Sequence, residues 1–504
     1  MTPEPSAAPD ATPGPAPAAS AGRGVRPWTR TTQLLLLAAG VLLALVAFVT
    51  VLTMPDLPYH PARDLELRAT YDAYRDTGVP LVKQNGTGSW YGQLPGGGLT
   101  KAAGDDDPGS YLIASWMSHV TGSASPYPGL IAVMAVLCAL PWLLLPLTVA
   151  RIFGRARAGF AMLGLPLLTW LVNGSLLLGS EYGQADLVSP VRVYALYGLP
   201  SAVILLSLVL VAFVLTHRTG WRVALTMTVL LLALATAGNL LRSMSGFGIA
   251  ALVAVVWWTA LRGRGRALAL GGAAAGLVVA VLGAHLLPGL VVDRIDARRA
   301  EVISPETARL PDAHGTWHPL YLGLSYPQPI TGQPSEFGVQ WSDEFGWNKA
   351  RETDPDVVPA STEYDEIIGG VYRDAVRAHP WAAVELYAAK LGYTAQHFAG
   401  MLVVIALGAL LAWRRRLPQA GAVRAALSTV PTVVLGLAPP VLVMPMLYYY
   451  SELVAALGFL SALALGALVV SMSDLRRDGA SADRGGAATP APDDLVLPAR
   501  HPIP

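Results

Sequence analysis

The chain has 504 residues, of which 53% are hydrophobic and only 14% are charged, and its mean hydropathy is +0.47. Soluble domains carry about 25% charged residues, so this composition excludes an ordinary soluble enzyme and indicates a protein that lies in a lipid bilayer. The 35 basic and 34 acidic residues nearly balance, which excludes a nucleic-acid-binding protein that relies on bulk positive charge. The single cysteine, Cys138, excludes a disulfide framework and a cysteine-based zinc site.

Both ends of the chain have a composition typical of disordered segments. Residues 1–31 are rich in Pro, Ala, Ser and Gly, and residues 473–504 are similar. Such segments bury too little apolar surface to offset the entropy lost on folding. The apolar run from Leu34 to Leu52 is too long for the core of a cleaved signal peptide and lacks a small-residue cleavage site. We therefore expect two disordered tails around a membrane domain over 32–472, which begins with an uncleaved transmembrane helix.

Ten segments of this domain are apolar enough to be read as membrane-spanning helices. A helix rises about 1.5 Å per residue and the hydrocarbon core is about 30 Å thick, so about 20 residues span it. The predicted spans are residues 32–54, 128–150, 158–178, 194–216, 223–241, 246–261, 268–291, 398–413, 425–446 and 447–471. The sixth and eighth are short, and only a turn near Pro445 separates the last two. The sequence therefore predicts an all-α integral membrane protein with about ten transmembrane helices.

Arginine clusters in the short connections predict the orientation of these helices. The clusters are Arg151, Arg155 and Arg157; Arg218 and Arg222; Arg262, Arg264 and Arg266; Arg414, Arg415 and Arg416; and Arg476 and Arg477. Short cytoplasmic loops are enriched in arginine and lysine, and one orientation places every cluster in the cytoplasm. It predicts a multi-pass protein of the cell membrane with both termini cytoplasmic.

The same orientation places two long connections outside: a first outer loop over 55–127 and a second outer loop over 292–397. A structureless loop longer than about 15 residues is usually functional or has a fold of its own. We therefore expect the polar chemistry on the outer face. We also expect the two loops to pack together as one domain, because neither has enough apolar residues for a separate core.

The predicted spans hold almost no charged residues near their centres, where charge usually marks an ion or substrate path. Polar exceptions lie near the predicted outer ends: Glu181, Asp186, Arg192, Arg242, Ser451 and Glu452. His285 lies deeper, in the seventh span, where a lone histidine is more typical of a structural hydrogen bond than of a ligand. With no clear inverted repeat in the sequence, this pattern disfavours a secondary transporter.

Two carboxylates follow the first span by about ten residues, which places Asp64 and Glu66 close to the outer membrane surface. A carboxylate there can act as a general base on an incoming hydroxyl or hold a divalent cation. The alternative is a solvated turn in which Asp64 pairs with Arg68, four residues later.

A second acidic group, Asp105, Asp106 and Asp107, ends the same loop immediately before Pro108. Asp107 before a proline is typical of a helix N-cap with proline in the first helical position. Three consecutive aspartates exceed what a cap needs, so contact with a metal ion or a phosphate-bound metal ion stays open.

The second outer loop contains an aromatic and histidine-rich stretch with His314, Trp317 and His318. Gly315 and Pro319 argue against a regular helix there. A two-histidine zinc site would need a third ligand, and none is evident. Substrate contact by Trp317 and His318 is favoured instead, because aromatic faces stack on sugar rings and imidazole donates hydrogen bonds to hydroxyl or phosphate groups.

Farther along this loop, Asp343 and Glu344 form another acidic pair. Ser361 is expected to begin an amphipathic helix, and Pro380 to begin a second one that contains Lys390. The second helix is expected to lie along the outer interface and to lead into the eighth span.

These features together resemble the GT-C superfamily, which consists of polytopic glycosyltransferases that use polyprenyl-phosphate-linked sugars. The residues that carry the resemblance are Asp64-Leu65-Glu66 with Ala69 and Tyr71; Asp106-Asp107-Pro108-Gly109-Ser110-Tyr111; and His379-Pro380 followed by Lys390. The resemblance covers roughly the N-terminal third and residues 310–395. The family's acid pair is adjacent or nearly so, and the intervening Leu65 leaves open whether Asp64 or Glu66 would be the base.

The resemblance implies an enzyme that moves a sugar from a polyprenyl-phosphate donor to an acceptor on the outer face of the cytoplasmic membrane. Asp64 is then the first candidate for the base, with Glu66 beside it. Cations for the donor phosphate are Arg192, Arg242 and Lys390, although the arginines are equally typical of interfacial anchors. The remaining candidates for substrate contact are Asp106, Asp107, His314, Trp317, His318 and Asp343.

The same resemblance implies membrane lipid and a lipid-linked sugar as partners. The cofactor stays open, with a divalent cation at Asp105, Asp106 and Asp107 as the alternative that the acidic run itself offers. Two other classes of protein are alternatives to a glycosyltransferase. A transporter or flippase of lipid-linked intermediates needs a polar path through the helices. A non-catalytic membrane assembly protein should keep its function when the loop acids are replaced.

Overall fold

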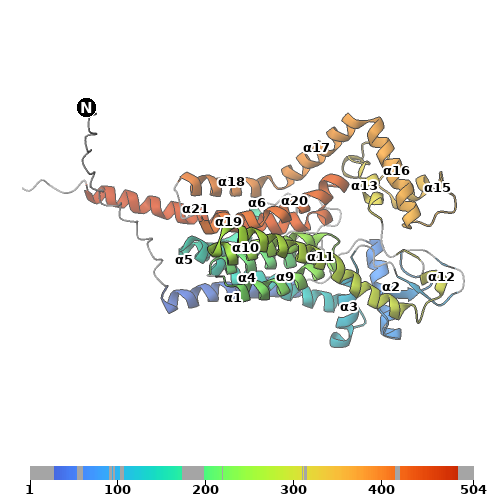
Figure 1. The fold of residues 1–504 in the computed structure, drawn as a ribbon, viewed down its shortest axis with the longest axis horizontal. Coiled ribbons are helices and arrows are strands. Elements are labelled where there is room, and N and C mark those ends of the chain that lie inside the picture. The colour runs from blue at the N-terminus through green and yellow to red at the C-terminus, as the bar shows by residue number, and fades with distance from the viewer. Residues whose placement is uncertain are drawn as a thin grey trace, which may run out of the picture.

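The computed structural model describes residues 28–53, 61–89, 93–94, 97–102, 107–172, 198–217, 219–308, 310–311, 315–414 and 420–485. Within these ranges the chain is almost entirely helical, and the long helices pack side by side in an elongated bundle (Figure 1). Eight of them are long and apolar enough to cross a membrane. The prediction of an α-helical membrane protein is confirmed at this level.

The eight candidate spans agree with eight of the ten predicted segments. They are formed by α1 (Arg30–Leu52), α4 (Tyr127–Phe153), α8 (Gly198–Leu215), α9 (Trp221–Leu241), α10 (Ser245–Leu261) with η3 (Arg262–Arg264), α11 (Arg266–Arg299), α19 (Ala420–Ser428) with α20 (Val430–Ala438) and the π-helix η4 (Pro439–Val443), and α21 (Ser451–Gly485). The short 3₁₀ helix η5 (Leu447–Tyr449) lies in the break before α21, close to the predicted turn at Pro445.

The other two predicted spans differ from a single straight helix. Residues 158–172 belong to α5 (Ala156–Phe160), η1 (Ala161–Gly164) and α6 (Leu165–Val172), and the rest of this predicted span lies outside the described residues. The eighth predicted span forms α18 (Ala399–Arg414), which follows α17 (Pro380–His397) at a bend of 72°. The predicted amphipathic helix and the short span are therefore two arms of one broken unit.

Small residues allow the helices of the bundle to approach closely. A Cβ atom at Gly40 of α1 would overlap the carbonyl oxygen of Leu143 in α4, and a Cβ at Gly408 of α18 would lie 2.5 Å from the Cβ of Ala464 in α21. Membrane helices pack through such small residues because the surrounding lipid supplies little hydrophobic driving force for their association. Burial differs greatly among the spans: 83% of the apolar window of α8 is buried, against 17% in α11.

The arginine-containing ends of several helices meet at one end of the bundle. Arg151 of α4 contacts His217 after α8, and Arg157 of α5 donates a hydrogen bond to the carbonyl oxygen of Val470 at 3.4 Å. Both loop segments gather at the opposite end, which we call the loop-bearing end (Figure 1). This arrangement agrees with the segregation that the arginine pattern predicts, while the assignment of either end to the cytoplasm stays a prediction.

The first loop contains α2 (Pro61–Thr77), the antiparallel strands β1 (Val82–Gln84) and β2 (Leu99–Lys101), and α3 (Pro108–Thr121), with Val82 opposite Lys101. Its small core includes Ala73 and Val82 together with Ile303 from the second loop. The short helix α12 (Pro305–Ala308) lies against β2, and Lys101 Nζ donates to the carbonyl oxygen of Leu310 at 2.8 Å. The start of the second loop therefore packs on the first, as expected.

The rest of the second loop has a core of its own, which corrects the expectation of one shared core. Its helices are α13 (Trp317–Gly323), α14 (Gln328–Thr331), α15 (Asp343–Arg351) and α16 (Thr362–Ala378). Their buried residues are Tyr321, Leu322, Leu324, Val339, Ala350, Val357, Tyr364 and Ile368. Large aromatic side chains explain why this part of the loop can form a separate core. Each of them buries a large apolar surface, so a few are enough even where apolar residues are few. We call this unit the aromatic core.

One further expectation about local structure is wrong. Residues 317–323 form the helix α13 despite Pro319, because proline fits the first turn of a helix, where the N–H groups have no intrahelical acceptor. Helix α21 extends to Gly485, beyond residue 473, and the expectation of a disordered tail stays a prediction. Extending an existing helix adds a hydrogen bond for each residue fixed, whereas starting a new one is unfavourable.

Candidate functional site

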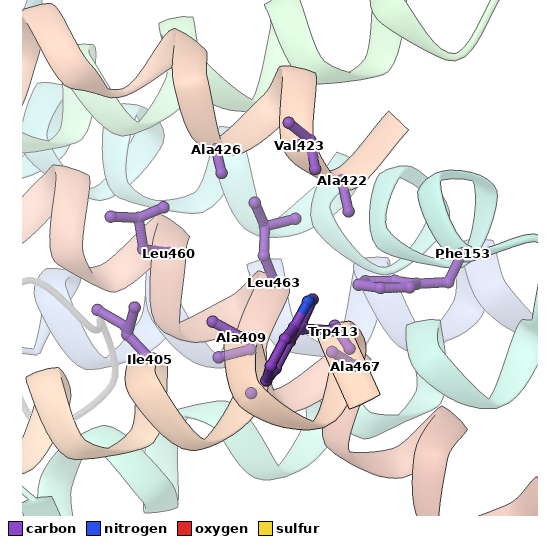
Figure 2. A pocket seen from close by; sticks show the side chains of 13 residues that line it. Phe153, Ile405, Ala409, Trp413, Ala422, Val423, Ala426, Leu460, Leu463 and Ala467 are labelled. Atoms are coloured by element: carbon purple, nitrogen blue, oxygen red, sulfur yellow. The ribbon is translucent and has the colours of Figure 1, made fainter. Parts of the chain in front are cut away.

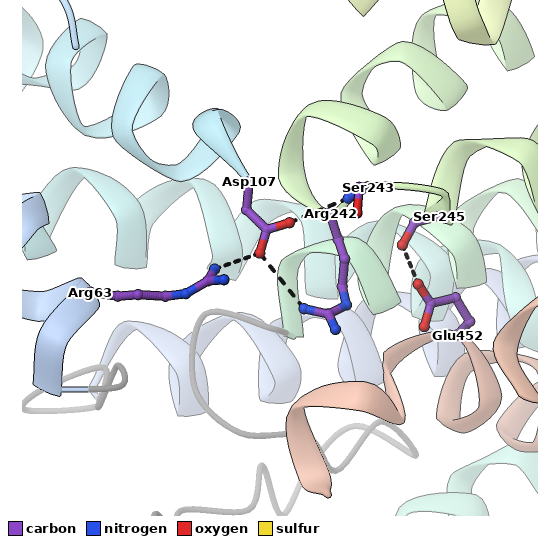
Figure 3. Close-up of polar contacts among 6 residues, drawn as sticks. All are labelled: Arg63, Asp107, Arg242, Ser243, Ser245 and Glu452. Carbon is purple, nitrogen blue, oxygen red and sulfur yellow. Dashed lines mark hydrogen bonds and ion pairs between the residues drawn. The ribbon is translucent and has the colours of Figure 1, made fainter. Parts of the chain in front are cut away.

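Polar side chains from four parts of the chain meet at the loop-bearing end of the bundle (Figure 3). Arg63 of α2 and Arg242, between α9 and α10, both point toward Asp107 at the start of α3. The distances from Asp107 Oδ2 are 2.6 Å to Arg63 Nη1 and 3.6 Å to Arg242 Nη1. Ser245 of α10 and Glu452 of α21 lie beside them. We call these five residues the junction cluster.

Asp107 is positioned by the two residues that follow it. Pro108 begins α3, and Gly109 brings the start of that helix against the end of α9, since a Cβ at Gly109 would lie 2.8 Å from the carbonyl oxygen of Leu240. Asp107 occupies the predicted N-cap position, but its side chain makes no capping hydrogen bond. Its Oδ1 instead accepts from the backbone N–H of Ser243 at 3.3 Å. The carboxylate therefore links α2, α3 and the break between α9 and α10.

Glu452 is a carboxylate enclosed by the helices of the bundle. It lies in the first turn of α21, is 4% exposed, and accepts a hydrogen bond at Oε1 from the hydroxyl of Ser245. Its Oε2 has no hydrogen-bond partner within the described residues. A Cβ at Gly436 of α20 would lie 2.8 Å from the Cβ of Glu452, so close packing holds the side chain in place. Ionisable groups at such positions in membrane bundles are candidates for function.

Asp64 has two carboxylate oxygens in different environments. Its Oδ2 accepts from Arg68 Nε at 3.0 Å, which is the i,i+4 pair that the sequence offered as an alternative. Its Oδ1 is buried and has no hydrogen-bond partner in the part of the chain that the structure describes. Asp64 directly follows Arg63, a member of the junction cluster, in the first turn of α2.

Glu66 has a different role, because it is 1% exposed and paired with a buried lysine. Its Oε2 accepts from Lys83 Nζ at 2.8 Å and from the backbone N–H of Ser89 at 2.9 Å. Gly88 passes so close that a Cβ there would overlap this oxygen, and its φ of +75° also suits glycine. This arrangement is typical of a carboxylate that holds a loop.

His318 lies inside the aromatic core, at 2% exposure. Its Nδ1 bonds the hydroxyl of Tyr364, and its Nε2 lies 3.2 Å from Oδ1 of Asp343. Burial, followed by the charges of Asp343 and Asp365, raises the pKa of Tyr364, so this tyrosine stays protonated and can donate to His318. His318 therefore joins α13, α15 and α16. Trp317 beside it is half-buried and packs on Tyr372, with ring centroids 5.6 Å apart.

Lys390 lies on α17 and is completely buried. Its Nζ donates to the carbonyl oxygen of Val443 at 2.6 Å and lies 5.3 Å from the ring centroid of Tyr387. The lysine thus satisfies a backbone group at the end of the π-helix η4. The expected contact of Lys390 with a donor phosphate near the membrane surface stays a prediction.

The predicted site residues are only partly brought together. Asp107 and Arg242 meet in the junction cluster, whereas His318 and Asp343 meet in the aromatic core. Asp105, Asp106, Arg192 and His314 lie outside the described residues, as do Glu181 and Asp186. Among the residues that are described, no group of three or more His, Cys, Asp or Glu side chains could hold a metal ion. His285 is exposed on α11.

Sequence reasoning missed Arg63 and Ser245. The position of Arg63 next to Asp64 is a weak signal that it belongs to a site. Its contact with Asp107 could not be predicted, because the two residues are 44 positions apart in the chain. Ser245 has no signal in the sequence apart from lying at the start of a predicted span. Glu452 was noted only as a polar residue near an outer helix end.

A cavity of about 190 Å³ near the arginine-containing end is unsuited to acid–base chemistry (Figure 2). Helices α4, α18, α19 and α21 line it with apolar side chains such as Phe153, Leu460 and Leu463. Among its lining residues only Trp413 carries a polar side-chain atom, an indole nitrogen. The junction cluster is therefore the better candidate for a functional site.

Comparison of the chain with protein-family models, with curated proteins and with solved structures finds no match.

Proposed function

We propose that the protein is a membrane glycosyltransferase that moves a sugar from a polyprenyl-phosphate donor to a hydroxyl acceptor at the loop-bearing end of the bundle. The observation that carries this proposal is the buried Oδ1 of Asp64, which has no hydrogen-bond partner among the described residues and belongs to the same first turn of α2 as Arg63. The orientation predicted from the arginine clusters puts this end on the outer face. A lipid phosphate at that surface holds its sugar just above the headgroups, at the level of these side chains.

The proposed reaction assigns a separate task to each kind of group. Asp64 takes the proton from the acceptor hydroxyl as the hydroxyl oxygen attacks the anomeric carbon of the sugar. The bond between that carbon and the phosphate oxygen breaks, and its electron pair leaves with the lipid phosphate. Arg63 and Arg242, which meet at Asp107, are the guanidinium groups that would stabilise the negative charge that develops on the phosphate. The proton ends on Asp64 and is released to water.

The environments of the two acids support Asp64 over Glu66 as the base. A base needs an oxygen that can accept a proton from the substrate. The pair with Lys83 and the hydrogen bond from Ser89 both engage Oε2 of Glu66. Asp64 keeps one oxygen without a partner among the described residues.

A second candidate function is supported by Glu452. A flippase or transporter of lipid-linked intermediates would need an ionisable group inside the bundle. Glu452, whose Oε2 has no hydrogen-bond partner among the described residues, is such a group. Under that function, Glu452→Gln would stop movement of a fluorescent polyprenyl-phosphate lipid across vesicles that contain the protein. Asp64→Asn would leave this movement unchanged.

The test of the transferase uses the full chain in nanodiscs with a panel of polyprenyl-phosphate donors that carry radiolabelled hexoses or pentoses, and with cell-envelope glycans as acceptors. Asp64→Asn keeps the size of the side chain but removes its basicity, so we expect transfer to fall by about 10²–10⁴-fold. Asp72→Asn, at an exposed position on the same helix, is the matched control and should transfer normally. Normal transfer by Asp64→Asn, or no transfer of any donor by the unaltered protein, would contradict the proposal.

A further inference from the structure

Helix α11 is longer than a bilayer requires. Its 34 residues extend roughly 51 Å at 1.5 Å per residue, whereas a bilayer with its headgroups is about 40–45 Å thick. Arg294 lies roughly 42 Å along the helix from Arg266, and Arg298 lies one turn farther on. If Arg266 lies at one surface of the membrane, these two arginines reach the headgroup layer of the opposite surface.

A groove of about 680 Å³ opens beside this part of α11. Ala233 of α9 and Leu287, Leu290 and Val291 of α11 supply apolar lining, while Arg294 and Arg298 supply its cationic side chains. Both arginines are exposed. Only 17% of the apolar window of α11 is buried by the rest of the chain, so this helix lies at the periphery of the bundle.

We propose that this groove holds an anionic phospholipid of the surrounding bilayer, with its phosphate between Arg294 and Arg298 and its acyl chains along Leu287 and Leu290. Side chains four positions apart lie on the same face of a helix, so the two guanidinium groups can bind one phosphate together. The lining includes no carboxylate that would pair with the amine of a zwitterionic headgroup. Charge complementarity therefore favours a lipid with net negative charge.

The occupant is a resident phospholipid rather than a sugar donor, because none of the lining residues belongs to the junction cluster and Asp64 is not among them. A donor must bring its sugar to the reacting groups, whereas a resident lipid need not. This inference is therefore independent of the proposed glycosyltransferase activity.

The groove also connects the bilayer to the first loop. Pro80 is one of its lining residues, and Arg299 Nη1, from the last turn of α11, donates to the carbonyl oxygen of Leu81 at 3.4 Å. Val82 and Lys83 follow directly in β1, where Lys83 pairs with Glu66. A lipid in the groove would thus contact and stabilise the segment from Pro80 to Lys83, which packs against α2.

The test is a native mass spectrometry titration of the delipidated full chain in detergent with dioleoylphosphatidylglycerol or dioleoylphosphatidylcholine. A basic side chain near an anionic lipid surface contributes roughly a fivefold gain in affinity. The double variant Arg294→Gln/Arg298→Gln should therefore bind the anionic lipid about 25-fold more weakly, with little change for the zwitterionic lipid. Arg294→Lys/Arg298→Lys keeps both charges and should retain most of the binding.

The matched control is Arg373→Gln/Arg377→Gln, which removes two exposed arginines with the same spacing from α16. It should bind both lipids like the unaltered protein. Equal binding of the two lipids by the unaltered protein, or unchanged binding of the anionic lipid by the Arg294 and Arg298 double variant, would overturn the proposal. Binding of a polyprenyl monophosphate at these arginines without binding of phosphatidylglycerol would also overturn it, and would identify a carrier-lipid site instead.

Discussion

Asp64 and Glu66 show how two residues of the same chemistry can acquire different roles within one helical turn. Positions two apart on an α-helix are separated by about 200° around its axis, so the two carboxylates leave α2 on nearly opposite sides. Glu66 enters the interior of the first loop and meets Lys83. Asp64 pairs with Arg68 at Oδ2 and keeps Oδ1 without a partner among the described residues.

The first residue-scale prediction concerns stability. Glu66→Gln leaves the Lys83 ammonium buried without its carboxylate, and breaking a buried ion pair from one side typically costs about 3–5 kcal/mol. We expect a clear fall in the midpoint of thermal unfolding in detergent. The control Asp64→Asn removes a half-exposed pair, which contributes only about 0–1 kcal/mol, and should melt almost normally. Equal melting of Glu66→Gln and the unaltered protein would show that the pair does not stabilise the loop.

At the scale of elements, close packing between α1 and α4 depends on the missing side chain of Gly40. Gly40→Ala adds the one carbon that would overlap the carbonyl oxygen of Leu143, so we expect a loss of about 1–3 kcal/mol, which is typical of overpacking. Gly271→Ala on α11 is the matched control, since a Cβ there would meet nothing within 4 Å. Thermal unfolding should rank the control at or above the unaltered protein and Gly40→Ala below it; the reverse order would contradict this packing.

The aromatic core gives a prediction about pH. Burial raises the pKa of Tyr364, and burial followed by the charge of Glu352 raises the pKa of Tyr321 to about 12. A tyrosine whose pKa is higher in the folded state than in the unfolded state stabilises the fold fully below about pH 10. That stability is lost as the pH rises through the folded-state values.

We therefore expect tryptophan fluorescence from Trp317 and its neighbours to report loosening of the aromatic core above pH 10 and little change from pH 7 to 9. Tyr364→Phe should weaken the alkaline dependence, at the cost of the hydrogen bond to His318, about 0.5–1.5 kcal/mol. An alkaline transition of the same size in this variant would assign the effect to other groups.

At the scale of the whole molecule, the two loops lie together at one end of the bundle (Figure 1), whereas Arg151 of α4 and Arg157 of α5 make their contacts at the other end. Cysteines placed at the exposed positions Asp76 and Gln333 of the loops, in a Cys138→Ala background, should react with a membrane-impermeant reagent in intact cells. A cysteine at Gly263, in the connection before α11, should be protected until the cells are opened. Protection of both loop positions would show that the topology is inverted.

Properties that depend on neighbouring residues could be predicted from the sequence. A bilayer requires about 20 consecutive apolar residues, and eight of the ten predicted spans appear as candidate spans. The acids of the first loop could be named as candidates, and the Asp64–Arg68 pair could be foreseen, because α-helical spacing is a local property. The bend between α17 and α18 could not be predicted in this way. The residues of each helix have a pattern that is compatible with a helix, and nothing in either pattern indicates the angle between them.

Composition and apolar run length determined by themselves that this chain is a helical membrane protein, because the bilayer imposes that requirement segment by segment. Only the tertiary structure decided that Arg63 and Arg242 share Asp107, because these residues lie far apart in the chain and no local pattern connects them. It also decided that Glu66 is paired and that His318 is buried against Tyr364, because burial depends on which helices pack over a side chain. Distant contacts of this kind arise from packing, which a single sequence does not display.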